Sequence, residues 1–218
     1  MTITTGVLER IAAARVVPVI TLEEVDAADG IAAALTAGGI GVAEITLRAG
    51  AGMRAIERMR ARDGILVGAG TVLTPEQVDQ VADAGAEFVI SPGLDVEVIQ
   101  RSAECSLLPI PGIATASEAQ AAIRLGLDFV KVFPAAQLGG PAFIDALSAP
   151  FPALRYLPSG GVTLESAKQY LGRDAVLAVG GSWLVPGAAV RERRFTQIEA
   201  ACRDTSTALA AVRPWISG

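Results

Sequence analysis

Eight short runs rich in β-branched and other apolar residues restrict the fold of this chain more than any other feature. They recur roughly every 20–27 residues, the spacing expected of strands that alternate with helices. Alternation of this kind predicts a parallel sheet, and eight repeats predict a barrel. The expected strands are residues 16–20, 42–47, 65–70, 88–91, 107–110, 129–133, 155–159 and 175–179.

Helix-start signals follow three of these runs. The segments Thr21–Glu24, Thr74–Gln77 and Thr115–Glu118 each have the spacing of a capping box, in which a threonine caps a helix and a Glu or Gln caps it in return. Pro75 occupies the favoured first helical position. Each of the three segments is therefore expected to begin a helix.

Two more helices are expected, at residues 5–14 and 195–212. We therefore predict an α/β fold with residues 1–218 in one domain: a single (β/α)8 TIM barrel of eight parallel strands with an extra N-terminal helix. Pro18 does not fit easily, because a proline inside a paired strand lacks the N–H that the sheet needs. A bulge at Pro18 is one explanation that the sequence leaves open.

Charge and composition exclude several classes of partner. The net charge is −5 and basic residues are interspersed with acidic ones, so no basic stripe for nucleic acid is expected. The densest basic segment, Arg191–Arg194, is interpreted as a solvated helix start. The N-terminus lacks a signal pattern and no apolar run is long enough to cross a bilayer, so we expect a cytoplasmic protein without membrane contact.

The chain contains no histidine. Nucleophiles activated by histidine and histidine-based metal sites are therefore excluded, and no metal site is expected. The two cysteines, Cys105 and Cys202, lie far apart without metal-like spacing and are expected to be inert thiols. Catalysis would have to use Lys, Glu, Asp, Arg, hydroxyl or backbone groups.

Strand alternation predicts which of these groups face the interior. Glu44, Thr46 and Arg48 share one face of the expected strand 42–47 and its end, while Lys131 shares a face with Phe133 in the strand 129–133. A lone strand lysine is usually paired or reaches water, and a Glu with an Arg usually forms an ion pair. The combination of Glu44, Arg48 and Lys131 inside one barrel favours a reactive lysine instead. Burial and a cationic neighbour such as Arg48 promote the neutral, nucleophilic form of the lysine amine.

Paired glycines follow the last two expected strands. Gly160 and Gly161 come after the seventh, and Gly180 and Gly181 come at the end of the eighth, before Ser182. In barrels the loops after these two strands commonly bind phosphate, because glycine allows backbone N–H groups to approach an anion. The pattern predicts an amine nucleophile next to a phosphate pocket.

These residues lie in segments that resemble the bacterial 2-keto-3-deoxy-6-phosphogluconate (KDPG) and 4-hydroxy-2-oxoglutarate (KHG) aldolases. The resemblance covers nearly the whole chain and is carried by VVPVI, EITLR, VGAGTVLT, ISPGLD, PIPGIAT, FVKVFPA, PSGGVT and VGGSWLV. It implies a metal-free, cofactor-free class I aldolase that forms a Schiff base and assembles as a homotrimer.

The resemblance also implies roles for individual residues. Lys131 would form the imine and Glu44 would be the general acid and base. The substrate carboxylate would be held by Arg48 and Thr71, and the phosphate by Gly160, Gly161, Gly181 and Ser182. The pocket wall would consist of Phe133, Pro134 and Ser159.

The implied reaction is reversible cleavage of KDPG, a phosphorylated 2-keto acid, to pyruvate and D-glyceraldehyde 3-phosphate. Ala136 and Gln137 stand where members with this substrate usually carry an acidic residue, while Ser159 can bond a substrate hydroxyl. Alternatives are the same chemistry on KHG or on 2-keto-3-deoxy-6-phosphogalactonate, a metal-dependent sugar-phosphate epimerase, and a barrel that binds a phosphometabolite without catalysis.

Overall fold

The structure is a computed structural model and is described for residues 3–212. Its strands are β1 (Val16–Ile20), β2 (Val42–Thr46), β3 (Leu66–Gly70), β4 (Phe88–Ile90), β5 (Leu108–Ile110), β6 (Gly112–Ile113), β7 (Phe129–Val132), β8 (Arg155–Pro158) and β9 (Val179–Gly181). Its helices are α1 (Ile3–Ala14), α2 (Ala28–Ala37), α3 (Gly52–Arg60), α4 (Pro75–Asp83), α5 (Val96–Glu104), α6 (Ala116–Arg124), α7 (Pro141–Ser148), α8 (Leu164–Leu171), α9 (Gly187–Arg191) and α10 (Phe195–Ala210), with a 3-10 turn η1 (Val25–Ala27).

The strands form two parallel sheets. Six strands pair in the order β5-β4-β3-β2-β1-β9, and three pair in the order β6-β7-β8. The fifth expected strand, residues 107–110, is present as β5, and a short strand that was not expected, β6, follows it after Pro111. The eighth expected strand is displaced, because continuous pairing begins only at Val179. The parallel α/β architecture is thus confirmed, while the pairing is divided between two sheets instead of one continuous set of eight strands.

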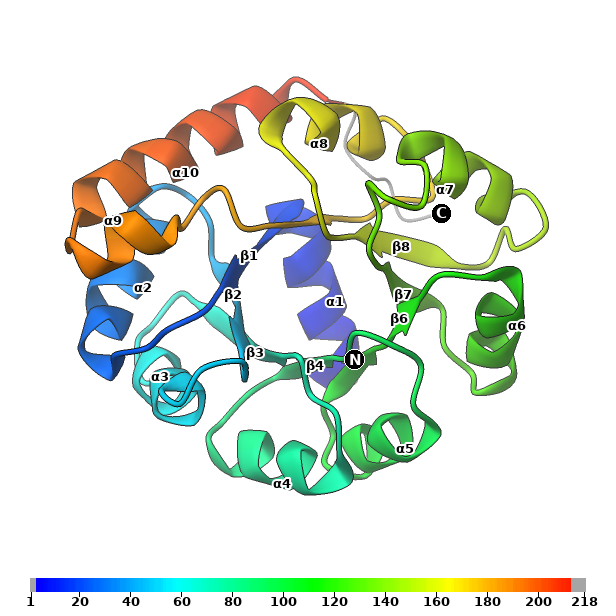
Figure 1. The fold of residues 1–218 in the computed structure, drawn as a ribbon, viewed down its shortest axis with the longest axis horizontal. Helices are drawn as coiled ribbons and strands as arrows, with labels where there is room; N and C mark the ends of the chain where they lie inside the picture. Colours follow the sequence, from blue (N-terminus) through cyan, green and yellow to red (C-terminus); the bar gives the residue numbers. More distant parts are fainter. Residues whose placement is uncertain (1–2, 213–218) are drawn as a thin grey trace.

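Backbone hydrogen bonds connect the two sheets beyond the named strands. The Tyr156 N–H of β8 donates to the Ala175 carbonyl at 2.8 Å, and the Leu177 N–H donates to the Tyr156 carbonyl at 3.2 Å. At the other side, the Lys131 N–H of β7 donates to the carbonyl of Pro111, which joins β5 to β6. The strands consequently curve around a common interior (Figure 1).

Pro18 lies where β1 changes its pairing partner. Val16, Val17 and Pro18 pair with β9, whereas Val19 and Ile20 pair with β2. Successive residues of β1 pair without an extra residue, so the proline is accommodated at this change and not by a bulge.

The expected helix starts have different outcomes. Thr74 and Thr115 cap α4 and α6, each accepting a hydrogen bond from the backbone N–H three residues later. The expectation for Thr21 is wrong, because the chain stays extended until η1, whose N-cap is Glu24 without a side-chain cap. A reciprocal capping box that the sequence interpretation missed starts α8, between Thr163 and Ser166.

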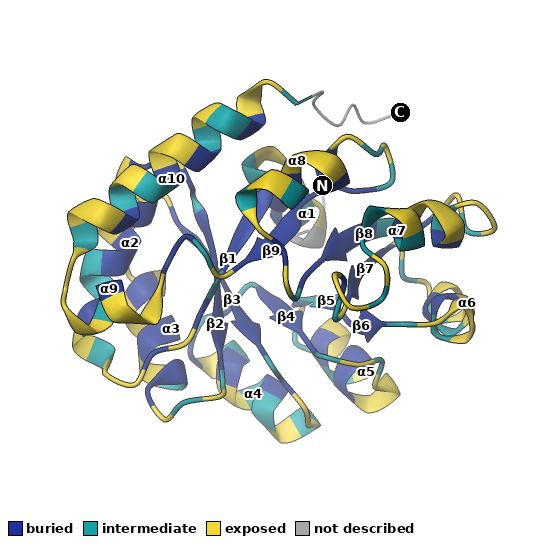
Figure 2. Cartoon of the chain, turned by 45° about the horizontal axis from the view of Figure 1, so that its top comes forward, coloured by how far each residue is buried: buried dark blue, intermediate teal, exposed yellow. Residues whose placement is uncertain are grey.

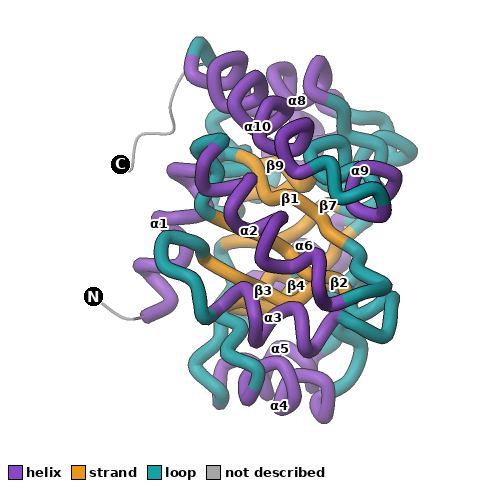
Figure 3. Tube along the Cα trace, turned by 90° about the vertical axis from the view of Figure 1, so that its left-hand side faces the viewer, coloured by secondary structure: helices purple, strands orange, loops and turns teal. Residues whose placement is uncertain are grey.

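Helices surround the strands and direct their apolar faces toward them (Figure 2). The buried side chains of helices and strands form one hydrophobic cluster. Helix α1 leads directly into the start of β1 and lies at the amino-terminal end of the strands (Figure 3). It therefore covers that end of the interior and leaves the carboxyl-terminal end for the loops. The segment Arg191–Arg194 is exposed, as expected.

Among the residues that the structure describes, no helix has both the length and the apolar character needed to cross a membrane.

The contact between α2 and α10 depends on the absence of a side chain at Gly38. A Cβ atom there would lie 2.3 Å from the Cβ of Cys202 and 2.8 Å from the Glu199 carbonyl oxygen. Gly38→Ala should lower the free energy of unfolding by about 1–3 kcal/mol, because the helices would have to separate. Urea denaturation measures this change.

Gly172→Ala is the matched control. Gly172 also ends a helix, and the nearest atoms to its added Cβ are 3.5 Å away, an ordinary contact distance. That variant should be unchanged or up to about 1 kcal/mol more stable. Equal stability of the two variants would contradict the close packing of α2 on α10.

Candidate active site

A cavity of about 290 Å³ opens at the carboxyl-terminal ends of the strands. Sites in parallel α/β proteins form at this end, because the loops that follow the strands meet there. The lining side chains and backbone come from β1, β2, β7 and β9 and from the loops after β2, β3, β4, β7, β8 and β9: Val19, Glu44, Thr46, Arg48, Thr71, Pro92, Lys131, Phe133, Ser159, Gly160, Gly161, Val162, Gly180 and Ser182.

Lys131 and Glu44 meet inside this cavity from two different sheets. The Lys131 side chain on β7 is 8% exposed and the Glu44 side chain on β2 is 1% exposed, with 3.6 Å between Nζ and Oε1. The Lys131 Nζ also lies 5.1 Å from the centre of the Phe133 ring. In the sheet, Lys131 is held between Gly112 and Leu157, which fixes the inward direction of its side chain.

This buried pair is poorly arranged as a stabilising ion pair. A charge-assisted hydrogen bond measures about 2.7–2.9 Å, so the 3.6 Å contact is long. Within residues 3–212 no group hydrogen-bonds to Oε2 of Glu44. Because two buried charges require close, fully satisfied contacts to offset their desolvation, stability does not explain the pair. Imperfectly satisfied buried ionisable groups in a cavity are typical of catalytic sites.

Gly70 makes the space that Glu44 occupies. A Cβ atom on Gly70, at the end of β3, would lie 2.1 Å from Oε1 of Glu44 and 2.6 Å from its Cγ. Since Gly70 pairs with Thr46 across the sheet, its backbone is fixed. Any larger residue would therefore push the Glu44 carboxylate away from Lys131.

Arg48 and Thr71 lie at one side of the cavity. The Arg48 Nη2 donates to Oγ1 of Thr21 at 3.0 Å. No carboxylate in the described part of the chain pairs with Arg48. Thr71 has φ 60°, a left-handed conformation that is unfavourable for a β-branched residue. An unpaired cation and a strained residue in one cavity mark a place where an anionic ligand can bind.

Glycines form the opposite side. Gly160 and Gly161 have φ values of 90° and 73° in the loop between β8 and α8, conformations that glycine adopts without strain. The Ala136 N–H donates to the Gly160 carbonyl at 3.1 Å, which ties this loop to the one after β7. With Ser182 nearby and the N-terminus of α8 beginning at Leu164, the loop suits an anion.

Most of the residues predicted from the sequence line the cavity, but two do not. Pro134 lies behind the glycine loop, since its Cα would be 3.1 Å from a Cβ on Gly160. Gly181 instead provides space for the Trp183 ring, whose indole N–H donates to Thr205 of α10. Neither Pro134, predicted as part of the pocket wall, nor Gly181, predicted to bind the phosphate, is among the residues that line the cavity, and both roles stay predictions.

Some lining residues were absent from the predicted site: Val19, Thr46, Pro92, Val162 and Gly180. Thr46 could have been included, because alternation places it on the same strand face as Glu44. Gly180 has a spatial role like that of Gly70, since a Cβ there would lie 2.5 Å from Oγ of Ser159. Such a contact between strands that are distant in sequence leaves no local pattern.

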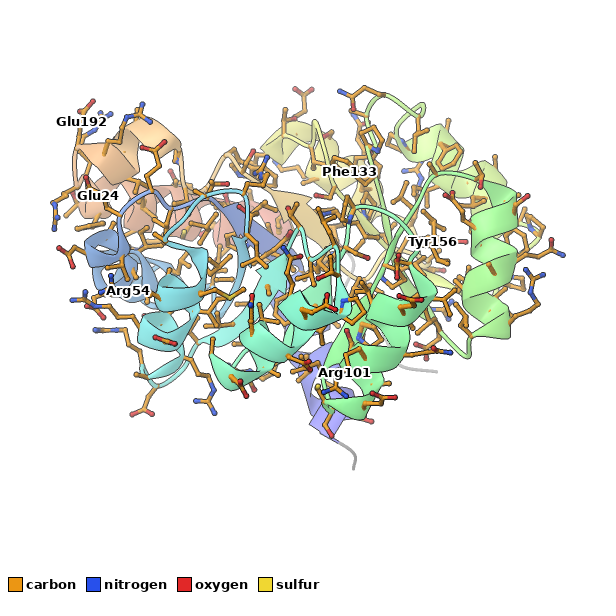
Figure 4. All side chains as sticks on the ribbon, turned by 60° about the horizontal axis from the view of Figure 1, so that its bottom comes forward. Glu24, Arg54, Arg101, Phe133, Tyr156 and Glu192 are labelled. Carbon is orange, nitrogen blue, oxygen red and sulfur yellow. The ribbon has the colours of Figure 1, made fainter. Side chains whose placement is uncertain are left out.

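Charged residues that do not line this cavity lie at the periphery of the molecule. In Figure 4, Phe133 lies near the middle of the molecule, whereas Glu24, Arg54 and Glu192 lie at its left-hand side. Across residues 3–212, no group of three or more His, Cys, Asp or Glu is placed to hold a metal ion.

Comparison with known proteins identifies the family. The family model described as "Aldolase: KDPG and KHG aldolase" matches residues 7–201. The 2-dehydro-3-deoxy-phosphogluconate aldolase of Treponema pallidum is 43% identical over 91% of this chain and 93% of its own length. The KHG/KDPG aldolase of Escherichia coli is 40% identical over 87% of this chain and 89% of its own length.

Solved structures agree with these sequence matches. The KDPG aldolase of Legionella pneumophila, with pyruvate captured as a covalent carbinolamine intermediate, superposes with a TM-score of 0.87. It is 38% identical, and the match covers 91% of this chain and 97% of the Legionella chain. The protein described here therefore belongs to the KDPG and KHG aldolase family.

Proposed function

We propose that this protein is a class I aldolase that reversibly cleaves KDPG to pyruvate and D-glyceraldehyde 3-phosphate. The observation that carries the proposal is the buried Lys131 Nζ, 3.6 Å from a Glu44 carboxylate that lacks a full set of partners. The carbinolamine in the Legionella relative supports covalent chemistry between pyruvate and an enzyme amine.

Lys131 acts as the nucleophile once it has lost a proton. Its Nζ attacks the carbonyl carbon C2 of the keto acid, and the resulting carbinolamine loses water to form an iminium ion. The C3–C4 bond then breaks, and its electron pair moves toward the iminium nitrogen to give an enamine. Protonation at C3 and hydrolysis release pyruvate and regenerate the amine.

Glu44 is the proton carrier for these steps. It is the carboxylate in contact with Lys131, so it can accept the proton that the amine loses and return one when water leaves the carbinolamine. During cleavage it takes the proton of the C4 hydroxyl, which becomes the aldehyde oxygen. Oε2 remains available for this second role, since Oε1 is the atom that faces Nζ.

The two sides of the cavity bind the two ends of the substrate. We assign the carboxylate to Arg48 and Thr71, and the phosphate to the backbone of Gly160 and Gly161 with Ser182. When the carboxylate and the phosphate of the substrate are both bound, C2 is oriented toward Lys131, and this positioning lowers the barrier to attack. Phe133 and Ser159 form the wall between the ends.

We also propose the larger arrangement that the resemblance implies. The two parallel sheets are segments of one closed eight-stranded (β/α)8 barrel that comprises the whole chain as a single domain. The hydrogen bonds of Tyr156 with Ala175 and Leu177 support this closure. Family membership supports a cytoplasmic homotrimer, in which partly exposed apolar residues such as Leu73 and Val96 are available for contacts.

Trapping with borohydride tests the imine. After incubation with pyruvate and borohydride, the intact protein should gain one reduced pyruvyl group, and peptide mapping should locate it on Lys131. Lys131→Ala should fold normally, gain no such group and be inactive, because no other lysine is among the described residues that line the cavity. A well-folded wild-type protein that forms no adduct at saturating pyruvate would refute the proposal.

Two different substitutions should slow turnover through Glu44: Glu44→Gln, which removes its charge, and Gly70→Ala, which displaces its carboxylate. Glu44→Gln should slow turnover by about 10²–10⁴-fold, the usual contribution of a general acid and base. Gly70→Ala should cause a loss of the same kind, since its methyl group occupies the position of Oε1. Gly50→Ala is the control, because nothing lies within 4 Å of its added Cβ. Steady-state turnover with a thermal melt of each variant separates chemistry from folding, and near-normal turnover by Gly70→Ala would contradict the assigned position of Glu44.

The choice of substrate depends on the glycine side of the cavity. KHG carries a carboxylate where KDPG carries a phosphorylated tail, so the ratio of their kcat/KM values measures the phosphate pocket. A ratio above about tenfold in favour of KDPG, or 1.4 kcal/mol, is expected. A smaller ratio would favour the second candidate, KHG cleavage, and the phosphogalactonate epimer tests the contribution of Ser159 to stereochemistry.

A further inference from the structure

Thr21 uses its hydroxyl group to contact two residues that line the catalytic cavity, Thr46 and Arg48, and not to start a helix. It follows directly after β1, and the chain reaches its first turn only at η1. The Thr21 Oγ1 accepts a hydrogen bond from Nη2 of Arg48 at 3.0 Å and lies 2.8 Å from Oγ1 of Thr46. The residue thus joins β1, the end of β2 and the loop that carries Arg48.

The sheet register brings these three residues together. Val19 is paired with Glu44 and Ile20 with Ile45, so the next residue of each strand, Thr21 and Thr46, are neighbours at the carboxyl-terminal end. Thr46 is 1% exposed and lines the cavity with Glu44. The hydroxyl of Thr21 is therefore held by a buried neighbour while it accepts from Arg48.

The hydrogen-bonding capacity of the three side chains is consistent with a chain of bonds. A guanidinium group only donates, whereas a threonine hydroxyl donates once and accepts through two lone pairs. Thr21 can therefore accept from Arg48 and still share a hydrogen bond with Thr46 in either direction. One N–H group of Arg48 is used here, and its other N–H groups remain available for a ligand.

Arg48 has an alternative direction in which to turn. A second cavity, of about 240 Å³, is lined by Thr21 and by charged residues of both signs: Glu23 and Glu24, with Arg191 and Arg193. Neither Glu23 nor Glu24 forms an ion pair within residues 3–212. Without a fixed contact, the long and exposed Arg48 side chain would also populate rotamers that point away from the catalytic cavity.

We propose that Thr21 is a positioning residue that holds the Arg48 guanidinium in place for the carboxylate of the 2-keto acid. This inference rests on the proposed function, in which Arg48 binds that carboxylate. Holding the guanidinium before the substrate arrives reduces the conformational freedom that binding would otherwise have to remove. The effect falls on substrate binding, since Thr21 touches neither Lys131 nor Glu44 through any hydrogen bond in the described structure.

Thr21→Val and Thr21→Ser test the inference as a matched pair. Valine keeps the shape and removes the acceptor, while serine retains the hydroxyl. The pyruvate concentration that gives half-maximal borohydride trapping, and the KM for KDPG, should rise about three- to tenfold in Thr21→Val with kcat nearly unchanged. Thr21→Ser should restore values close to those of the wild type.

The dependence on Arg48 distinguishes positioning from a general structural effect. In an Arg48→Met background, Thr21→Val should have little further effect on KM, because methionine has no N–H group to donate to Thr21 and the interaction is already lost. An unchanged KM in Thr21→Val, or an equal increase in both backgrounds, would overturn the role of Thr21 while leaving the aldolase function intact. A wild-type protein that forms no imine with pyruvate would instead overturn both.

Discussion

The contact between Lys131 and Glu44 sets the requirements that the surrounding structure meets. The two side chains come from β7 and β2, which belong to different sheets, and they meet at 3.6 Å in the interior. This approach requires sheets that curve toward each other and a neighbouring strand without a side chain at Gly70. A protein gains little stability from such a pair, since both groups lose hydration and one Glu44 oxygen has no hydrogen-bond partner within residues 3–212. Reactivity explains the arrangement better than stability does.

The parts of this site that the sequence predicted correctly are those with a local periodicity. Alternation along one strand is enough to place Glu44 and Lys131 inside, because a residue on the other face would have to contact the helices. The displacement of the eighth strand and the extra strand β6 were missed, because pairing there depends on partners such as Tyr156 and Lys131 that come from other segments. The same dependence on distant segments explains the wrong prediction for Thr21. Its sequence has the spacing of a capping box, but its hydroxyl forms hydrogen bonds with Arg48 and Thr46 instead of capping a helix.

Glycines at strand ends look alike in the sequence and differ in the structure. Gly160 and Gly161 adopt positive φ angles and form a loop, as a glycine-rich turn predicts. Gly70 and Gly180 lie beside interior side chains from other segments: Gly70 leaves room for Glu44, and Gly180 leaves room for Ser159. Gly181 leaves room for the Trp183 ring, and its predicted contact with a phosphate stays a prediction. Only the neighbours in three dimensions distinguish a glycine that is needed for a turn from a glycine that makes room for another side chain.

The two cations of the cavity differ in how their charges are balanced, and this difference favours one class of ligand. Lys131 has Glu44 beside it, so its proton can move to an internal carboxylate without a change in the net charge of the cavity. Arg48 cannot lose its charge and has only the neutral Thr21 as a side-chain partner in the described structure. A ligand carboxylate can supply that negative charge in a charge-assisted hydrogen bond, whereas a simple ketone offers the guanidinium no charge. With Arg48 assigned to the substrate carboxylate, a preference for 2-keto acids over simple ketones is the expected consequence.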